Sequence, residues 1–146
     1  MAEMFTSGHA SSPNWRDAAA QCLLQAGRGP AGANLGFLYV TDNFAGDVAN
    51  IVNYFRSNTG IAQWSGTVGM GVIATGREYY DEPAVAIMLC AFEPDCFRVF
   101  GSMRSPMDLE RQSMHLGDLP ANFAIVHADP RNAQLNRLVG DLAGCL

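Results

Sequence analysis

Residues 36–43 read Gly-Phe-Leu-Tyr-Val-Thr-Asp-Asn, an apolar run that closes on three polar residues. Such a run predicts a buried strand, and the polar residues after it predict the start of a helix. Residues 122–130 read Asn-Phe-Ala-Ile-Val-His-Ala-Asp-Pro and have the same pattern. The apolar helical positions after the two runs match at a constant offset of about 87 residues, which is typical of a repeated unit. The sequence therefore predicts a pseudo-symmetric fold with a repeated strand-helix unit.

The two predicted units differ in the length of chain that comes after them. After the first unit the chain continues into a glycine-containing strand over 64–73, whereas the second unit is followed by the last residue, Leu146. We therefore expect one and a fraction repeats of a longer architecture, without its C-terminal part. With 146 residues the chain has the length of one domain, so we expect a disordered leader over 1–11 and that domain over 12–146.

Helical and strand patterns alternate along the chain in the order αβαβββ(α)βα. This order favours an α/β fold with a mixed, helix-covered β-sheet, and an α+β fold is the alternative. The first two helices are expected to end at Gly27 and Gly60. The expected helices begin at Ser12-Pro13, at Asp42 or Asn43, at Pro106 and at Asp129-Pro130, and the expected strands cover 35–40, 64–73, 84–92, 96–101 and 123–127.

The composition excludes several classes of partner. The net charge is −5 and all nine cationic residues are arginine, which argues against nucleic acid and against an anionic membrane surface. The longest apolar run, over 84–92, is too short to span a bilayer. Residues 1–13 lack the basic and apolar regions of a secretory signal, so we expect a cytoplasmic protein. The four cysteines form no CxxC pair and are expected to stay reduced.

A glycine motif, Gly66-x-x-Gly69-x-Gly71, is the most conspicuous local feature. A dinucleotide fingerprint needs a helix after its glycines, but here a strand continues, so that interpretation fails. Two interpretations stay open. The glycines can serve close backbone packing or a bulge, or they can leave a bare strand surface, with Thr67, on which a ligand approaches the backbone.

The residues Thr41, Asp42 and Asn43 mark the point where a strand ends and a helix begins. Ligands bind at this place in α/β sheets, because free helix N–H groups favour an anion. A plain N-cap is the alternative role for Asp42 or Asn43. Glu78 belongs to a charged turn that is either solvated or placed to bind a ligand ammonium.

Histidine and cysteine spacing predicts no metal site. His127 ends a predicted strand and is therefore the best single candidate for an axial haem ligand, but we expect no cofactor and a colourless protein. The sequence has no GxSxG elbow and no other legible pair of nucleophile and base, so we do not expect an enzyme.

The stretch from Leu35 to Phe92 resembles the N-terminal domain of the FIST (F-box and intracellular signal transduction) family. The resemblance is carried by the segments 36–40, 65–73, 78–81 and 84–89, and 125–130 fits as well. It implies a sensory module of bacterial signalling proteins that binds small ligands, proposed to include amino acids. Some family members bind haem, and members usually have an N-terminal and a C-terminal part. The family pattern offers no catalytic residues.

We therefore expect a small-ligand-binding sensory domain of a signal-transduction protein, with an amino-acid-like ligand. The alternatives are a haem-binding sensor and a non-catalytic interaction module completed by a partner, either the C-terminal FIST part or a signalling protein. A missing half would leave an apolar face or strand edge uncovered, so we also expect a homodimer. The expected ligand-binding residues are Thr41, Asp42, Asn43, Gly66, Thr67, Gly69, Gly71 and Glu78.

Overall fold

The computed structural model describes residues 4–113 and 122–144. These residues form two compact units, of which the first ends at Phe97 and the second begins at Arg98. The sequence predicts one domain over 12–146, and this stays a prediction; within it the contacts of the chain cluster on either side of this boundary.

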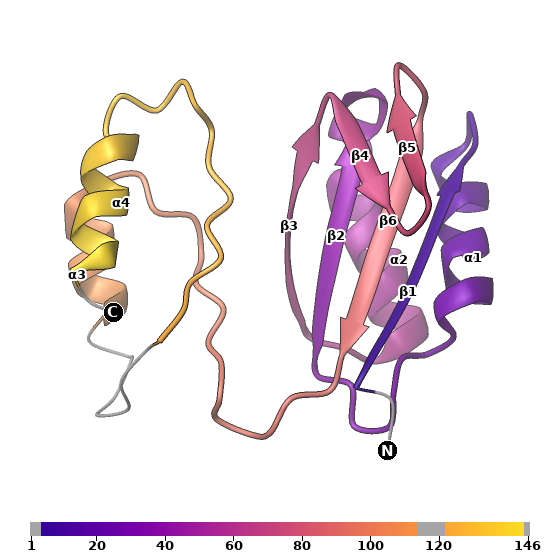
Figure 1. Cartoon of the computed structure of the whole chain (residues 1–146), viewed down its shortest axis with the longest axis horizontal. Coiled ribbons are helices and arrows are strands. Elements are labelled where there is room, and N and C mark those ends of the chain that lie inside the picture. Colours follow the sequence, from indigo (N-terminus) through magenta and orange to yellow (C-terminus); the bar gives the residue numbers. More distant parts are fainter. Residues whose placement is uncertain (1–3, 114–121, 145–146) are drawn as a thin grey trace. The chain divides into compact units, whose positions relative to one another are not determined.

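The first unit contains a mixed four-stranded sheet with the strand order β1-β6-β2-β3 (Figure 1). The strands are β1 (Phe5–Ser11), β2 (Leu35–Thr41), β3 (Gln63–Gly69) and β6 (Ala84–Cys90). β6 runs antiparallel to both of its neighbours, whereas β2 and β3 are parallel. The prediction of an α/β fold with a mixed sheet is confirmed.

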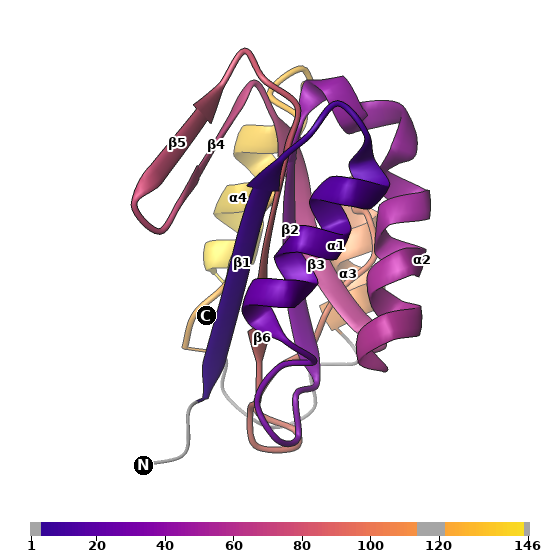
Figure 2. The same cartoon turned by 90° about the vertical axis from the view of Figure 1, so that its right-hand side faces the viewer.

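Two helices cover one face of this sheet, as Figure 2 shows. They are α1 (Trp15–Ala26) and α2 (Val48–Thr59), and a 3₁₀ helix, η1 (Asp42–Asp47), precedes α2. The helices end at Gly27 and Gly60, as predicted; Gly60 takes the left-handed conformation, with φ 78°, and its N–H bonds to Arg56 O. A Cβ at Gly8 would collide with the backbone of Cys22, so this glycine lets α1 approach β1 closely.

The core lies between the helices and this face of the sheet. Alternate residues of each strand point into it, as expected for a pleated sheet. Its sheet residues include Ala10 of β1, Leu38 and Val40 of β2, and Val85, Ile87 and Leu89 of β6, and its helix residues include Ala18, Ala19, Cys22, Ile51 and Phe55.

The aromatic ring of Trp64 joins three elements of the core. It lies over Gly36 of the neighbouring strand, where a Cβ would come within 2.5 Å of the ring. The ring also stacks on Phe55 of α2, with 5.6 Å between the centroids, and its Nε1–H donates to the Ile61 carbonyl at 2.8 Å. Gly36 therefore leaves the space for a side chain that connects β2, β3 and α2.

A β-hairpin of β4 (Gly71–Ala74) and β5 (Arg77–Tyr80) lies on the opposite side of the sheet from the helices (Figure 2). Val72 and Tyr79 are paired in this hairpin and both are buried. The sequence predicts one strand over 64–73 and a turn over 74–83. The structure instead breaks the strand at Met70 and makes the second half part of a separate two-stranded sheet.

The second unit contains α3 (Pro106–Ser113) and α4 (Leu135–Ala143), which pack against each other. The predicted short helix at Pro106 is confirmed. The last helix begins at Leu135, later than the predicted start at Asp129-Pro130, where Asp129 instead accepts hydrogen bonds from the N–H and side chain of Arg131.

Three other predictions about the elements are wrong. Residues 5–11, expected in a disordered leader, form β1, because β6 supplies seven paired positions along this segment. The first helix begins at Trp15, not at Pro13, because the Asn14 side chain accepts from the Arg16 N–H as its N-cap. Asp42 and Asn43 begin η1 and not α2, whose N-cap is Asp47.

The predicted strands over 96–101 and 123–127 are absent, since neither segment has a strand partner in the described residues. A helix follows each of the two apolar runs, but only the first run forms a strand. The predicted repeat of a strand-helix unit is therefore present only in its helices. An isolated apolar segment does not form a strand without a ladder of backbone bonds.

Gly66 generates a prediction about stability. It has φ 155°, and a Cβ there would collide with the Leu38 carbonyl oxygen. We expect Gly66→Ala to lower the free energy of unfolding by about 3 kcal/mol or more, because the parallel pair would have to separate. Gly46→Ala is the control, since nothing lies within 4 Å of its Cβ position. Urea unfolding measures both, and equal midpoints for the two variants would contradict the prediction.

Candidate functional site

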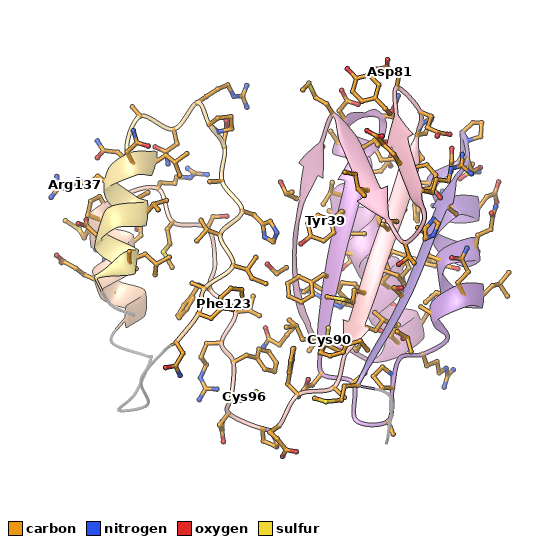
Figure 3. The ribbon with its side chains drawn as sticks, viewed as in Figure 1. Tyr39, Asp81, Cys90, Cys96, Phe123 and Arg137 are labelled. Carbon is orange, nitrogen blue, oxygen red and sulfur yellow. The ribbon has the colours of Figure 1, made fainter. Side chains whose placement is uncertain are left out.

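The face of the sheet opposite the helices, which we call the open face, carries four rows of side chains. Each row crosses β1, β6, β2 and β3 in that order. The rows are Phe5-Cys90-Leu35-Gln63, Ser7-Met88-Phe37-Ser65, His9-Ala86-Tyr39-Thr67 and Ser11-Ala84-Thr41-Gly69. Figure 3 shows Tyr39 half-way along β2 and Cys90 at the end of β6, with Asp81 beyond the far end, next to the hairpin.

The hairpin is attached to β1 by two side-chain hydrogen bonds. His9 Nδ1 lies 2.5 Å from the Tyr79 hydroxyl, and the Ser11 hydroxyl donates to Glu82 Oε2 at 2.7 Å. Arg77 completes the group, because its Nη2 lies 3.3 Å from Glu82 Oε1 and its guanidinium stacks 4.5 Å from the centre of the Tyr79 ring. We call these five side chains the latch cluster.

The electrostatics of the latch cluster follow from its hydrogen bonds. The bond from Ser11, and then the bond and charge of Arg77, hold the pKa of Glu82 below its ordinary value of 4.5. Burial raises the pKa of Tyr79, although the charge of Arg77 acts in the other direction. At neutral pH the cluster therefore contains a carboxylate, a guanidinium and a neutral phenol.

Aromatic side chains gather at the other end of the open face. The rings of Phe5 and Phe92 meet edge to face at 5.7 Å, and Phe92 packs on Phe97 at the same distance. Between this aromatic group and the hairpin lie the middle rows, with Met88 and Ser7 exposed on the floor. Of the apolar side chains in the middle rows, Met88 is exposed, whereas Phe37 and Ala86 are buried. A small apolar surface at Met88 thus lies between the aromatic group and the charged latch cluster, an arrangement suited to a small amphipathic ligand.

Thr41 has a structural role in this face. It is fully buried, and its Oγ1 accepts a hydrogen bond from the Ala84 N–H at 2.8 Å. This bond joins the end of β2 to the start of β6. Thr41 therefore lies at the predicted edge of the sheet, but its hydroxyl is buried and bonded to the Ala84 N–H, so it is not exposed to a ligand.

Several of the other predicted ligand residues lie at the same end of the sheet as Thr41: Gly69 pairs with Thr41, and η1, which begins with Asp42 and Asn43, contacts β3. Asp42 and Asn43 are exposed at the start of η1, which is too short to act as a helix-end anion site. Thr67 lies on the open face and is exposed. Glu78 is paired with the exposed Ile73, on the side of the hairpin away from the buried Val72 and Tyr79.

The glycines favour the packing interpretation over the bare-surface one. Gly66 is paired with Leu38, which belongs to the helix-covered core, so it does not line the open face. A Cβ on Gly69 would lie 2.9 Å from the Gly71 carbonyl oxygen, and one on Gly71 would lie 2.9 Å from the Tyr79 carbonyl oxygen. These glycines permit the tight passage from β3 into the hairpin.

Two buried cysteines and His127 are further candidates for reactive groups. Burial raises the pKa of the Cys22 thiol to about 12 and that of Cys90 to about 11, so both are thiols at neutral pH. His127 lies in a stretch without regular structure, and burial lowers its pKa. Within the described ranges, no three side chains of His, Cys, Asp or Glu lie together in a way that could hold a metal ion.

The sequence does not single out the latch residues. His9 and Ser11 fall in the expected leader, and Arg77, Tyr79 and Glu82 fall in an expected turn. One sequence pattern could have predicted that residues 5–11 form a strand: small or apolar residues at 8 and 10 alternate with polar ones at 7, 9 and 11.

Comparison with protein families gives a match to the FIST N domain over residues 34–146. The chain belongs to the FIST family. The matched range begins just before β2, so the FIST N match contains the hairpin while β1 and α1 lie ahead of it. A comparison with curated proteins found no significant match. In the part of the chain that the structure describes, no helix has the length and apolar character needed to cross a bilayer.

The first prediction from this site concerns Thr41. We expect Thr41→Val to lower the free energy of unfolding by about 1–3 kcal/mol, because it leaves the buried Ala84 N–H without its acceptor. Thr41→Ser keeps the hydroxyl and should recover most of this loss. Urea unfolding at neutral pH compares the two variants, and a serine variant no more stable than the valine variant would argue against the hydrogen bond.

The second prediction concerns Glu82 and pH. Because its pKa is lower in the folded protein than its ordinary value of 4.5, ionised Glu82 stabilises the fold above that value. This stabilisation is lost as the pH falls from 4.5 through the lowered folded-state pKa. We expect Glu82→Gln to flatten the decline of the unfolding midpoint in this acid range, as measured by thermal melts. In the control variant Glu78→Gln, the unfolding midpoint should fall with pH as steeply as in the parent protein. The prediction is contradicted if the midpoint of Glu82→Gln falls as steeply as that of the parent.

Proposed function

We propose that this FIST domain is a sensory module of a signal-transduction protein and that it binds a small, amino-acid-like ligand on the open face of its sheet. Membership of the FIST family supports the signalling role. The observation that carries the ligand proposal is the latch cluster beside the small apolar surface at Met88. The proposed ligand site lies at the hairpin end of the open face, whereas the sequence predicts it at the strand-helix junction at Thr41 and Asp42.

The Arg77–Glu82 pair matches the two charges of an amino acid. The side chains are 53% and 34% exposed, so the pair is accessible from solvent. An exposed ion pair contributes only about 0–1 kcal/mol, so exchanging it for ligand contacts costs little. A ligand carboxylate would bind the guanidinium of Arg77, and a ligand ammonium would bind the carboxylate of Glu82.

The floor of the open face supplies the apolar part of the site. Met88 is 38% exposed between β1 and β2, and Ala86 and Tyr39 lie in the next row towards the hairpin. Thr67 ends that row and stays in the proposed site, as the one predicted ligand residue that shares the row. A ligand side chain of moderate size would cover Met88.

A second candidate function is a non-catalytic interaction module, with the C-terminal FIST part, a signalling protein or a second copy as the partner. It is favoured by the apolar residues exposed in the second unit, among them Phe123, Ile125 and Val139. Exposed apolar residues are typical of a protein contact where they form one contiguous patch. We place both candidate functions in the cytoplasm.

Native mass spectrometry of freshly purified protein, followed by calorimetric titration with the proteinogenic L-amino acids, tests the ligand proposal. We expect Arg77→Gln to weaken binding of the best amino acid at least about tenfold, because a charge-assisted hydrogen bond is worth roughly 1.5–3 kcal/mol. Arg56→Gln, an exposed arginine on α2, is the matched control and should bind as the parent does.

Two outcomes would contradict this proposal. If neither a carried-over molecule nor heat of binding is detected, the open face is not an amino-acid site. If Arg77→Gln and Arg56→Gln bind an identified ligand equally well, the ligand lies elsewhere on the protein.

A further inference from the structure

The outer edge of β1 presents unpaired backbone groups. β1 lies at the end of the sheet and pairs on one side only, with β6. In an antiparallel pair, alternate residues direct both backbone groups to the partner strand and those between them direct theirs away. The Met4 carbonyl accepts from the Ala91 N–H and the Ser12 N–H donates to the Pro83 carbonyl, so the even-numbered residues direct their backbone groups towards β6. The odd-numbered residues from 5 to 11 therefore direct their N–H and C=O groups outward.

The side chain of Gln25 closes this edge at one position. The His9 N–H donates to Gln25 Oε1 at 3.0 Å, and Gln25 Nε2 donates to the His9 carbonyl at 2.8 Å. One carboxamide thus makes the two bonds that a residue of a neighbouring strand would make. The edge therefore already binds an amide group, supplied by α1.

Next to this amide the edge is hollow. A cavity of about 310 Å³ is lined by Phe5, Thr6, Ser7, Gln25 and Met88. On the open face it exposes apolar surface, since Phe5 is 44% and Met88 38% exposed. On the other face the Thr6 hydroxyl is buried and has no hydrogen-bond partner. Backbone donors, an apolar surface and an unsatisfied hydroxyl thus meet at one place.

We propose that the edge of β1 from Phe5 to Ser7 docks an extended segment of a partner protein, in which apolar residues alternate with serine or threonine. Residues opposite Phe5 and Ser7 would exchange backbone bonds with them and place their apolar side chains against Phe5 and Met88. The residue between them would lie on the side of Thr6, and its hydroxyl would bond to Thr6 Oγ1 once that side chain turns out of its buried rotamer. The docking edge contains no residue of the latch cluster, although the docked segment and the proposed ligand would both cover Met88. The inference does not depend on the proposed ligand.

The probe is the labelled peptide acetyl-Thr-Leu-Thr-Leu-Thr-amide, and its binding is followed by fluorescence anisotropy. Ser7→Pro removes an outward N–H but no bond to β6, because edge strands tolerate proline on that side. We expect it to weaken binding about tenfold, while Ser7→Ala, which keeps the N–H, binds as the parent does. In the parent, peptide binding should slow hydrogen exchange at the Ser7 amide and leave the Ala10 amide unchanged.

A second measurement does not depend on the folding of a variant. The same peptide with both leucine amides N-methylated cannot donate to β1 and should bind the parent protein about tenfold more weakly. Equal binding of the two peptides would overturn the proposal, as would no binding of the plain peptide up to about 1 mM, the weakest affinity that a short docked strand is expected to show. A dimer of the parent that Ser7→Pro converts to a monomer would overturn it as well, because the edge would then belong to a second copy.

Discussion

The position of the Trp64 ring over Gly36 is the contact on which the rest of the first unit depends. The ring stacks on Phe55, and its N–H is satisfied by the Ile61 carbonyl, so one side chain fixes β3, α2 and the turn between them. Any larger residue at position 36 would displace the ring. Because this contact fills the helix side of β2 and β3, the opposite side of the sheet remains for the hairpin and for a ligand. We therefore propose a ligand site on the face of the sheet that the helices do not cover.

The sequence predicts two kinds of element correctly. One kind is a strand that is buried on both faces, and the other is a helix end that is set by local backbone geometry. The run at 36–43 and the run at 84–92 are apolar because β2 and β6 are inner strands. Gly27 and Gly60 end helices through local backbone geometry. The sequence does not predict β1, because an edge strand buries little apolar side-chain area. Its residues buried on the core side are the small Gly8 and Ala10, which give no apolar pattern. The apolar run at 123–127 misleads for the opposite reason, since propensity alone supplies no partner for its backbone.

The same distinction applies to the candidate site. The strand-helix junction at Thr41 is recognisable from local pattern, yet its side chain serves the sheet by accepting from Ala84. The latch cluster joins residues that are 70 and 71 positions apart, and nothing in the residue types signals that pairing. The glycines at 66, 69 and 71 are explained by close backbone contacts, which a sequence pattern cannot separate from a ligand surface. Only the long-range register of the strands distinguishes glycines that allow close packing from glycines that line a ligand surface.

The pairing of β1 with β6 has a consequence for how the protein folds. β1 leaves the ribosome before the other three strands of its sheet, but the residues that pair with it are synthesised only after α1, β2, α2 and β3. The parallel unit of β2, α2 and β3 can close earlier, since its contacts are shorter in sequence. During that interval both edges of β1 are bare, and the segment is open to chaperones and to aggregation. The carboxamide of Gln25, which lies on the helix directly after β1, can cover part of one edge long before β6 arrives to cover the other.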